Sequence, residues 1–320
     1  MLFPTTAPTD RMFSWEERLC DFMKRPIFTG SGVALVTPFT ETGVNYPKLE
    51  ELIEFHIAHK TDALIICGTT GEGSTLTMEE HEEVLKFCVD KAKGRIPMIA
   101  GTGSNDTSSA VRLCRYAEEV GYDGLLIVTP YYNKATQKGL CAHYGKIAES
   151  TRLPIILYNV PSRTGVSISL DTLKYLDERY ENINAIKEAG GDVAFAAKIK
   201  AHTNLCIYSG NDDVTVPMIA IGCQGVISVI ANILPKETHD MCQLAEHGNL
   251  EAANKLYLGM LDIMDAMFYE VNPIPVKTAM NLLGFDVGIL RLPLCEMEEK
   301  NLERLKAAMI NYGLMLRGAD

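Results

Sequence analysis

The sequence predicts a (β/α)8 TIM barrel followed by a C-terminal helical layer. From Thr29 onward, short apolar segments and amphipathic helical segments alternate eight times over about 200 residues. The apolar segments are continuous rather than alternating, which is typical of parallel strands with helices outside and packed side chains inside. A doubly wound dinucleotide-binding sheet is disfavoured, because Gly101-Thr102-Gly103 lacks the third glycine of G-x-G-x-x-G.

Each element is expected from its own local pattern. The strands should end near Thr37, Gly68, Gly101, Pro130, Val160, Ala189, Gly210 and Ile230. The helices between them are expected over 46–60, 78–93, 106–120, 137–150, 169–180, 192–202 and 214–222. Thr77 and Glu80 form a capping box at the start of the second helix, and Gly121 ends the third.

The chain divides into three parts. Residues 1–26 are expected to be an N-terminal appendage, flexible or with a short helix over 14–22 capped by Ser14. Residues 27–250 would form the catalytic barrel. Residues 251–320 contain only helical patterns, broken near Asn272-Pro273-Ile274-Pro275 and again over 284–293.

Composition restricts the class of protein. The 320 residues are 47% hydrophobic and 22% charged, which is typical of a globular protein with a large core. A net charge of -11 without a Lys/Arg-rich run disfavours nucleic-acid and membrane-surface partners. No apolar run reaches the roughly 18 residues of a membrane span, and the first 22 residues lack the apolar core expected of a secretory signal.

Cysteine and histidine usage points to a cytoplasmic protein without a structural metal. The nine cysteines are widely spaced and form no C-x-x-C pair, which indicates reduced thiols. His56 and His59 share a helix face, but no third ligand follows them, so a solvated face is favoured over a metal site.

Lys187 stands in the apolar segment expected to form the sixth barrel strand, Ile183-Asn184-Ala185-Ile186-Lys187. An ammonium buried there is costly unless it is paired or deprotonated, and a deprotonated lysine is a nucleophile that forms imines with ketones. On this segment alone, a strand-end lysine that reaches out to water is the favoured explanation. Period-2 alternation places Lys187 on the face of Ala185 and Ile183.

Two threonines follow the second strand, in Gly68-Thr69-Thr70-Gly71-Glu72-Gly73. The glycines allow close backbone approach to a ligand, and N–H groups with two hydroxyls suit a carboxylate. No Gly-Lys-Ser/Thr follows, which excludes a nucleotide P-loop.

Tyr158 lies at the end of the fifth strand, and Arg163 follows it by a few residues. Tyr132 follows the fourth strand. A tyrosine at a strand end is equally often a packing residue. Because adjacent strands lie about 4.8 Å apart, inward-facing Tyr158 and Lys187 would meet at the barrel mouth. That pair would supply an amine nucleophile and a phenol for proton transfer, while Arg163 could hold a carboxylate.

Together these residues resemble the dihydrodipicolinate synthase / N-acetylneuraminate lyase family. Residues 63–80 resemble its signature around Gly-Thr-Thr-Gly-Glu, and residues 158–189 resemble the one from Tyr-Asn-Val-Pro to Ile-Lys-Glu-Ala. The likeness runs from about residue 28 to the C-terminus. The Thr69-Thr70 pair and Ser162-Arg163-Thr164-Gly165 are closer to the synthase members than to the sialic-acid lyases.

The resemblance implies condensation of pyruvate with L-aspartate 4-semialdehyde, in the diaminopimelate and lysine pathway. Pyruvate would form an imine on Lys187, so no cofactor or metal is needed. Thr69 and Thr70 would lie near its carboxylate. Tyr158, Thr70 and Tyr132 would form a proton relay, with Tyr132 reaching in from a neighbouring subunit.

Further implications concern the second substrate and assembly. Arg163 would hold the carboxylate of aspartate semialdehyde, while Gly210 and Ile227 match backbone positions that line the site. A shared Tyr132 implies at least a dimer, and a homotetramer is expected.

One departure concerns feedback by lysine. Inhibited members carry histidine and glutamate where this chain has Met78 and Ser109, although His81, Asn105 and Tyr131 are kept. We expect weak or absent inhibition by lysine, because the carboxylate that would pair the effector's ammonium is missing.

Two alternatives stay open from the sequence. Another class I pyruvate-dependent aldolase, acting on a 2-oxo sugar acid or sialic acid, would share the imine and differ in its aldehyde. A carboxylate sensor that binds without turnover would need neither the lysine nor the tyrosine.

Overall fold

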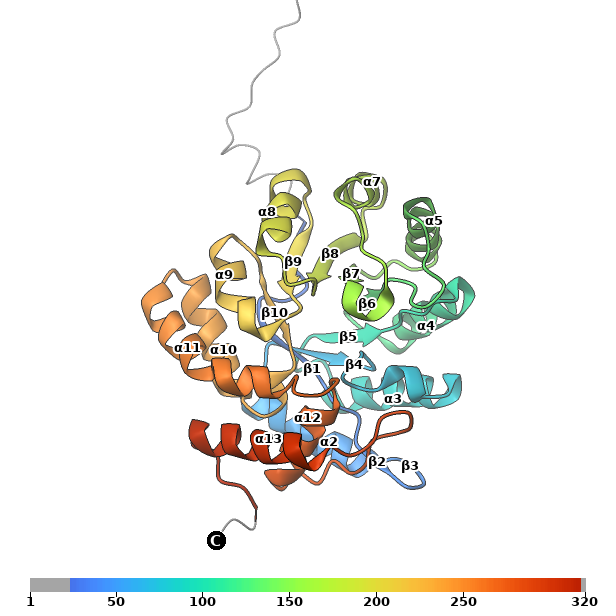
Figure 1. Cartoon of the computed structure of the whole chain (residues 1–320). Helices are drawn as coiled ribbons and strands as arrows, with labels where there is room; N and C mark the ends of the chain where they lie inside the picture. The colour runs from blue at the N-terminus through green and yellow to red at the C-terminus, as the bar shows by residue number, and fades with distance from the viewer. Residues whose placement is uncertain (1–23, 318–320) are drawn as a thin grey trace, which may run out of the picture.

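The computed structural model describes residues 24–317 of the chain. Eight parallel strands close into a barrel in the order β1-β10-β9-β8-β7-β6-β5-β4 (Figure 1). This confirms the predicted (β/α)8 fold. The barrel strands are β1 (Gly30–Ala34), β4 (Ala63–Ile66), β5 (Met98–Gly101), β6 (Gly124–Val128), β7 (Ile155–Asn159), β8 (Ile183–Glu188), β9 (Cys206–Ser209) and β10 (Gly225–Ser228). A small antiparallel pair, β2 (Phe39–Thr40) and β3 (Gly43–Val44), follows β1.

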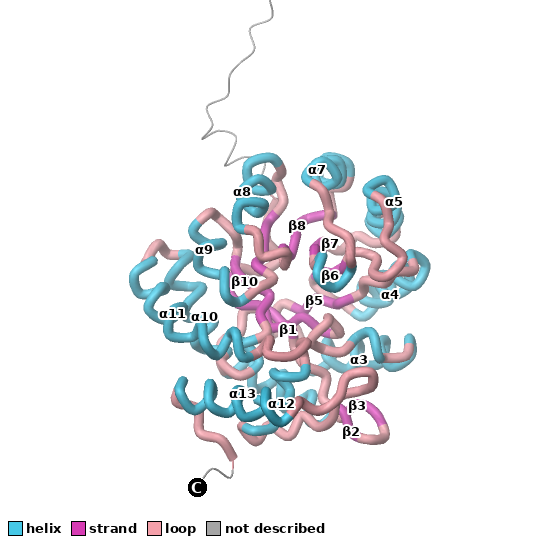
Figure 2. The backbone as a smooth tube through the Cα atoms, in the orientation of Figure 1, coloured by secondary structure: helices cyan, strands magenta, loops and turns pink. Residues whose placement is uncertain are grey.

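Helices surround the strands (Figure 2). Those of the barrel are α2 (Tyr46–Ala58), α3 (Met78–Ala92), α4 (Thr107–Val120), α5 (Gln137–Ala148), α7 (Leu170–Arg179), α8 (Val193–His202), α9 (Thr215–Ala220) and α10 (Pro235–Glu246). Shorter turns are α6 (Pro161–Thr164), η1 (Gly73–Thr75), η2 (Asp212–Val214) and η3 (Ile230–Asn232). The C-terminal layer consists of α11 (Leu250–Ala266), α12 (Ile274–Leu282) and α13 (Glu299–Tyr312).

The predicted caps fix the helix starts and ends. The Thr77 hydroxyl accepts from the Glu80 N–H at 3.2 Å, and the Glu80 carboxylate accepts from the Thr77 N–H at 3.0 Å. Gly121, with φ of 99°, closes α4 in the left-handed conformation that favours glycine. These caps are local, which is why the sequence locates them within one or two residues.

Alternate residues of the barrel strands enter two different cores, with one exception in β8. Along β7, Ile156 and Tyr158 join the cluster inside the barrel, whereas Ile155 and Leu157 join the cluster between strands and helices. Both faces are therefore apolar, which explains the continuous apolar segments in the sequence.

The register of β8 corrects one prediction. Ile183 pairs with Ile155 but Ala185 pairs with Ile156, so the ladder shifts at this point. As a result Ile183 packs in the outer cluster while Ala185 lies inside. The expectation that Ile183 shares the face of Lys187 is wrong, because an irregularity breaks the period of two.

Lys24 ties the start of the described chain to the barrel. Its ammonium lies 2.8 Å from the Asp177 carboxylate and donates to the carbonyls of Tyr180 and Ile183. Its backbone N–H also donates to Asn204 at 3.2 Å. The expected short helix over 14–22 lies outside the described residues.

The C-terminal helices are interrupted where the sequence predicts. α11 ends before Asn272-Pro273, and the connection from α12 to α13 covers the expected break over 284–293. α12 contacts η3 and α13, which brings the C-terminal layer next to the carboxyl end of β10. Between residues 24 and 317 no helix is long and apolar enough to cross a membrane.

Candidate active site

A cavity of about 650 Å³ lies at the carboxyl ends of the barrel strands. This is the end of the barrel at which catalytic groups gather in this fold. Six residues predicted from the sequence line it, namely Thr69, Thr70, Tyr158, Arg163, Lys187 and Gly210.

Lys187 and Tyr158 are paired across neighbouring strands. They are register partners on β8 and β7, and the Lys187 ammonium lies 4.4 Å from the centre of the Tyr158 ring. Lys187 is only 5% exposed, so it does not reach out to bulk water. Burial raises the pKa of Asp212, a carboxyl in η2, and the positive charge of Lys187 partly offsets that rise.

The loop that carries Thr69 and Thr70 folds tightly against the strand ends. A Cβ at Gly73 would lie 2.3 Å from the Cys67 carbonyl oxygen, so only glycine fits. Glu72 between the glycines has a left-handed φ of 52°. Thr70 is buried, and its hydroxyl accepts a 2.9 Å hydrogen bond from the side-chain amide of Asn272.

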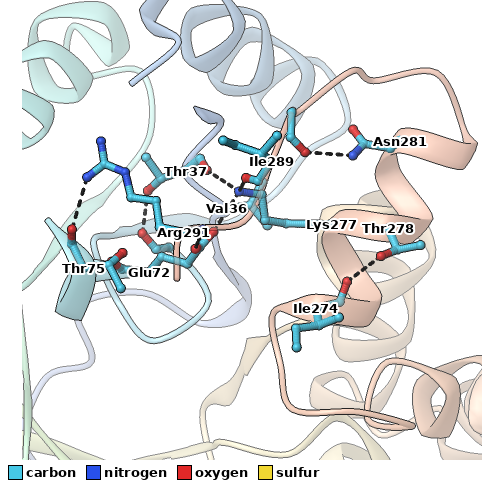
Figure 3. A network of polar contacts seen from close by, with 12 residues as sticks. Val36, Thr37, Glu72, Thr75, Ile274, Lys277, Thr278, Asn281, Ile289 and Arg291 are labelled. Atoms are coloured by element: carbon cyan, nitrogen blue, oxygen red, sulfur yellow. Dashed lines mark hydrogen bonds and ion pairs between the residues drawn. The ribbon is translucent and has the colours of Figure 1, made fainter. Parts of the chain in front are cut away.

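Glu72 anchors this loop to the C-terminal layer (Figure 3). Its carboxylate lies 2.7 Å from the ammonium of Lys277 on α12 and accepts from the Arg291 backbone N–H at 3.0 Å. Lys277 is 1% exposed and also donates to the carbonyls of Thr37 and Ile289. Burial lowers the pKa of Lys277, although Glu72 opposes the shift. Each partner thus compensates the other's buried charge.

Arg163 enters the cavity from α6, directly after β7. One of its N–H groups donates to the backbone carbonyl of Asn272 at 2.9 Å. A guanidinium carries five N–H donors, so it keeps the capacity to bind a carboxylate with two parallel hydrogen bonds.

Three further predicted residues have different surroundings. A Cβ at Gly210 would lie 2.5 Å from that of Ala189, so the backbone approaches closely there. Ile227 is fully buried in the core inside the barrel and does not line the cavity. Tyr132 is 89% exposed on the loop after β6, and the cavity of a single chain is formed without it.

A second cavity of about 390 Å³ adjoins the first and shares Thr69, Tyr158 and Arg163 with it. Of the residues expected at the effector pocket, Met78, His81, Ser109 and Tyr131 line it, and Asn105 does not. The residues that line it include no aspartate or glutamate.

Asn272 is a site residue that the sequence did not reveal. The segment Asn272-Pro273-Ile274-Pro275 indicated only a break between helices. Its side chain contacts Thr70, 202 residues away, so no local pattern could signal this contact.

The site can support imine chemistry. A buried amine, a phenol and a hydroxyl surround one cavity, which is what nucleophilic attack on a ketone with proton transfer requires. Among residues 24–317, no group of three or more His, Cys, Asp or Glu residues is arranged to hold a metal ion.

Several named proteins are similar to this chain over nearly its whole length. A Clostridium tetani protein named 4-hydroxy-tetrahydrodipicolinate synthase is 55% identical over 291 residues, covering 90% of this chain and 99% of that protein. A protein of the same name from Acetivibrio thermocellus is 55% identical over 92% of this chain and 100% of its own length. The crystal structure of dihydrodipicolinate synthase from Aquifex aeolicus is 46% identical, with a TM-score of 0.89 over 91% of this chain and 100% of that one.

The family model described as the dihydrodipicolinate synthetase family matches residues 27–311. This match begins shortly after the first described residue and ends within α13. It therefore covers the whole barrel, the cavity and the C-terminal layer, and the chain belongs to the dihydrodipicolinate synthetase family.

Proposed function

We propose that this chain is a Schiff-base-forming lyase, a 4-hydroxy-tetrahydrodipicolinate synthase, that condenses pyruvate with L-aspartate 4-semialdehyde. The reaction belongs to diaminopimelate and lysine biosynthesis, the pathway implied by the name that the relatives carry. The observation that carries the proposal is the buried Lys187 ammonium 4.4 Å from the Tyr158 ring in the cavity that Arg163 also lines.

In the first half of the reaction, Lys187 acts as the nucleophile. Its deprotonated Nζ attacks the ketone carbon of pyruvate and gives a carbinolamine, which loses water to form an imine. Tyr158, Thr70 and Tyr132 carry the protons that this dehydration releases and consumes. Thr69 and Thr70 bind the pyruvate carboxylate on the tight loop after β4.

In the second half, the imine loses a proton from its methyl carbon and becomes an enamine. The enamine carbon attacks the aldehyde carbon of aspartate semialdehyde, whose carboxylate Arg163 holds. The amine of that substrate then attacks the imine carbon, which closes the ring and releases Lys187. Gly210 contributes backbone to the wall of the site, whereas Ile227 lies in the core inside the barrel.

Arg163→Lys should raise KM for aspartate semialdehyde about 10- to 100-fold, because an ammonium cannot form the paired N–H contacts of a guanidinium. A coupled assay with varied pyruvate and aspartate semialdehyde measures this effect. KM for pyruvate serves as the internal control and should stay within about twofold.

An unchanged KM for the aldehyde would reject the role given to Arg163. A panel of 2-oxo sugar acids and sialic acids, tested in the cleavage direction with the same preparation, separates the synthase from the alternative aldolases. Efficient cleavage of one of them would identify that activity instead.

We also propose a homotetramer in which Tyr132 completes the site of a neighbouring subunit. The exposure of Tyr132, and the fact that it does not line the cavity of its own chain, support this reading. Lys187→Ala and Tyr132→Phe chains, co-expressed with different tags and purified as mixed assemblies, should regain activity. In such a mixture an intact Lys187 meets an intact Tyr132 from the other chain.

Mixed assemblies no more active than either variant alone would refute a shared tyrosine. Sedimentation equilibrium of the wild-type protein gives the number of subunits independently.

Lysine is expected to inhibit weakly or not at all. The cavity at Met78 and Ser109 lacks a carboxylate, so nothing there pairs the ammonium groups of the effector. Titration of lysine into the coupled assay measures this, and inhibition at millimolar or lower concentration would contradict it. Ser109→Glu is the informative variant, since it restores one carboxylate and should increase sensitivity.

A further inference from the structure

Asn272 contacts two residues that line the larger cavity, Thr70 and Arg163. It lies between α11 and α12, is 5% exposed, and lines the larger cavity. Its side-chain amide donates to the Thr70 hydroxyl at 2.9 Å, and its backbone carbonyl accepts from Arg163 at 2.9 Å. One residue of the C-terminal layer therefore contacts a group on the pyruvate side and a group on the aldehyde side.

The contact with Thr70 determines what that hydroxyl can still do. A threonine hydroxyl has one donor and two acceptor lone pairs. When the Asn272 amide occupies one lone pair, one donor and one acceptor remain. A link in a proton relay must accept one proton and pass on another, so this is the state in which Thr70 can serve.

The oxygen of the Asn272 side-chain amide accepts no hydrogen bond from the described residues. This atom, Oδ1, is buried and has no hydrogen-bond partner between residues 24 and 317. A buried polar atom without a partner is costly. The Asn272 side chain therefore makes its hydrogen bond within the described residues through its N–H group, to Thr70.

The C-terminal layer fixes the position of Asn272. The Lys277 N–H donates to the Pro273 carbonyl at 3.0 Å, and the Lys277 ammonium is paired with Glu72 on the loop that carries Thr70. The buried pair of Lys277 and Glu72 (Figure 3) is thus a second connection between the segment of Asn272 and the loop of Thr70.

We propose that Asn272 is a positioning residue for the condensation: its side-chain amide orients the Thr70 hydroxyl for proton transfer, and its backbone carbonyl orients Arg163. This inference rests on the proposed function. It assigns part of the active site to the C-terminal layer, outside the barrel itself.

The two contacts predict a split between kinetic constants. Asn272→Leu removes the amide but keeps the backbone carbonyl, so kcat should fall about 30-fold while KM for the aldehyde stays within about twofold. Asn272→Asp keeps the shape but replaces the donor by an acceptor, and it should not rescue kcat. The solvent isotope effect on kcat should rise in both variants, because proton transfer becomes slower.

A double-mutant cycle with Thr70→Val tests whether Asn272 acts through Thr70. In the Thr70→Val background, Asn272→Leu should cost less than about twofold in the rate of pyruvate adduct formation under borohydride. Equal, multiplicative losses in both backgrounds would overturn the proposal, as would full activity of Asn272→Asp.

Asn281 provides a matched control on the same layer. Its amide also donates one 2.9 Å hydrogen bond, to Gly288, and its Oδ1 is likewise buried without a partner among the described residues. It does not line the cavity, so Asn281→Leu should keep wild-type kcat. A comparable loss in this variant would attribute the Asn272 effect to folding and overturn the assignment.

The wild-type protein separates failure of this inference from failure of the proposed function. Suppose that the wild type forms the pyruvate adduct and turns over aspartate semialdehyde, and that Asn272→Leu keeps wild-type kcat. This result rejects only the positioning role. A wild type inactive in both assays rejects the proposed function, and the positioning role with it.

Discussion

Lys187→Ala is expected to lower kcat by about 10⁴-fold or more, because removal of the amine abolishes covalent catalysis altogether. In the wild type, pyruvate with borohydride should add the mass of a reduced imine to the peptide that contains Lys187. No such mass should form in the variant. Mass spectrometry of digested protein measures both results.

Two controls accompany this experiment, one at Lys187 itself and one at a second buried lysine. Lys187→Arg keeps a positive charge but forms no imine, so it should be as inactive as the alanine variant. Lys277 is a second buried lysine, and its ammonium is fully occupied by Glu72 and two carbonyls. It should therefore carry no adduct. An adduct on a peptide other than that of Lys187 would reassign the nucleophile.

The sequence predicted the parts of the fold that depend on local chemistry. The capping box of Thr77 and Glu80, the glycine end of α4, and the continuous apolar strands are each determined by neighbouring residues. The pairing of Tyr158 with Lys187 also followed from a period of two over a short strand end. The same rule failed at Ile183, because a shift in the ladder depends on the neighbouring strand and not on the segment itself.

Contacts between distant segments could not be predicted in this way. Glu72 was visible as part of a glycine-rich loop, but its partner Lys277 follows it by 205 residues. Asn272 and Pro273 predicted a break between helices, and the break is present. That prediction contained no information about the contact between Asn272 and Thr70. The sequence alone therefore predicts that Lys187 and the Thr69-Thr70 loop meet at one cavity. It predicts the C-terminal helices too, but not the contacts that Asn272 and Lys277 make with that loop.

Lys277→Met is expected to lower the free energy of unfolding by about 3–5 kcal/mol, because it leaves the Glu72 carboxylate buried without its partner. The carbonyls of Thr37 and Ile289 lose a donor as well. Urea denaturation at one fixed protein concentration measures the change. Lys86→Met is the matched control: it removes a lysine from an exposed pair with Asp90 on α3 and should barely move the urea midpoint.

The double variant Glu72→Gln, Lys277→Met separates the contribution of this ion pair to stability from its contribution to pyruvate binding. Without either charge, no ion is left buried and unpaired, so the double variant should be more stable than Lys277→Met alone. The loop that carries Thr69 and Thr70 lacks its connection to α12 in both variants, so KM for pyruvate should be raised about tenfold or more in Lys277→Met and in the double variant. Recovery of both stability and KM would mean that the pair serves the fold alone. Recovery of stability without KM would mean that the buried charges hold the substrate loop in its catalytic position.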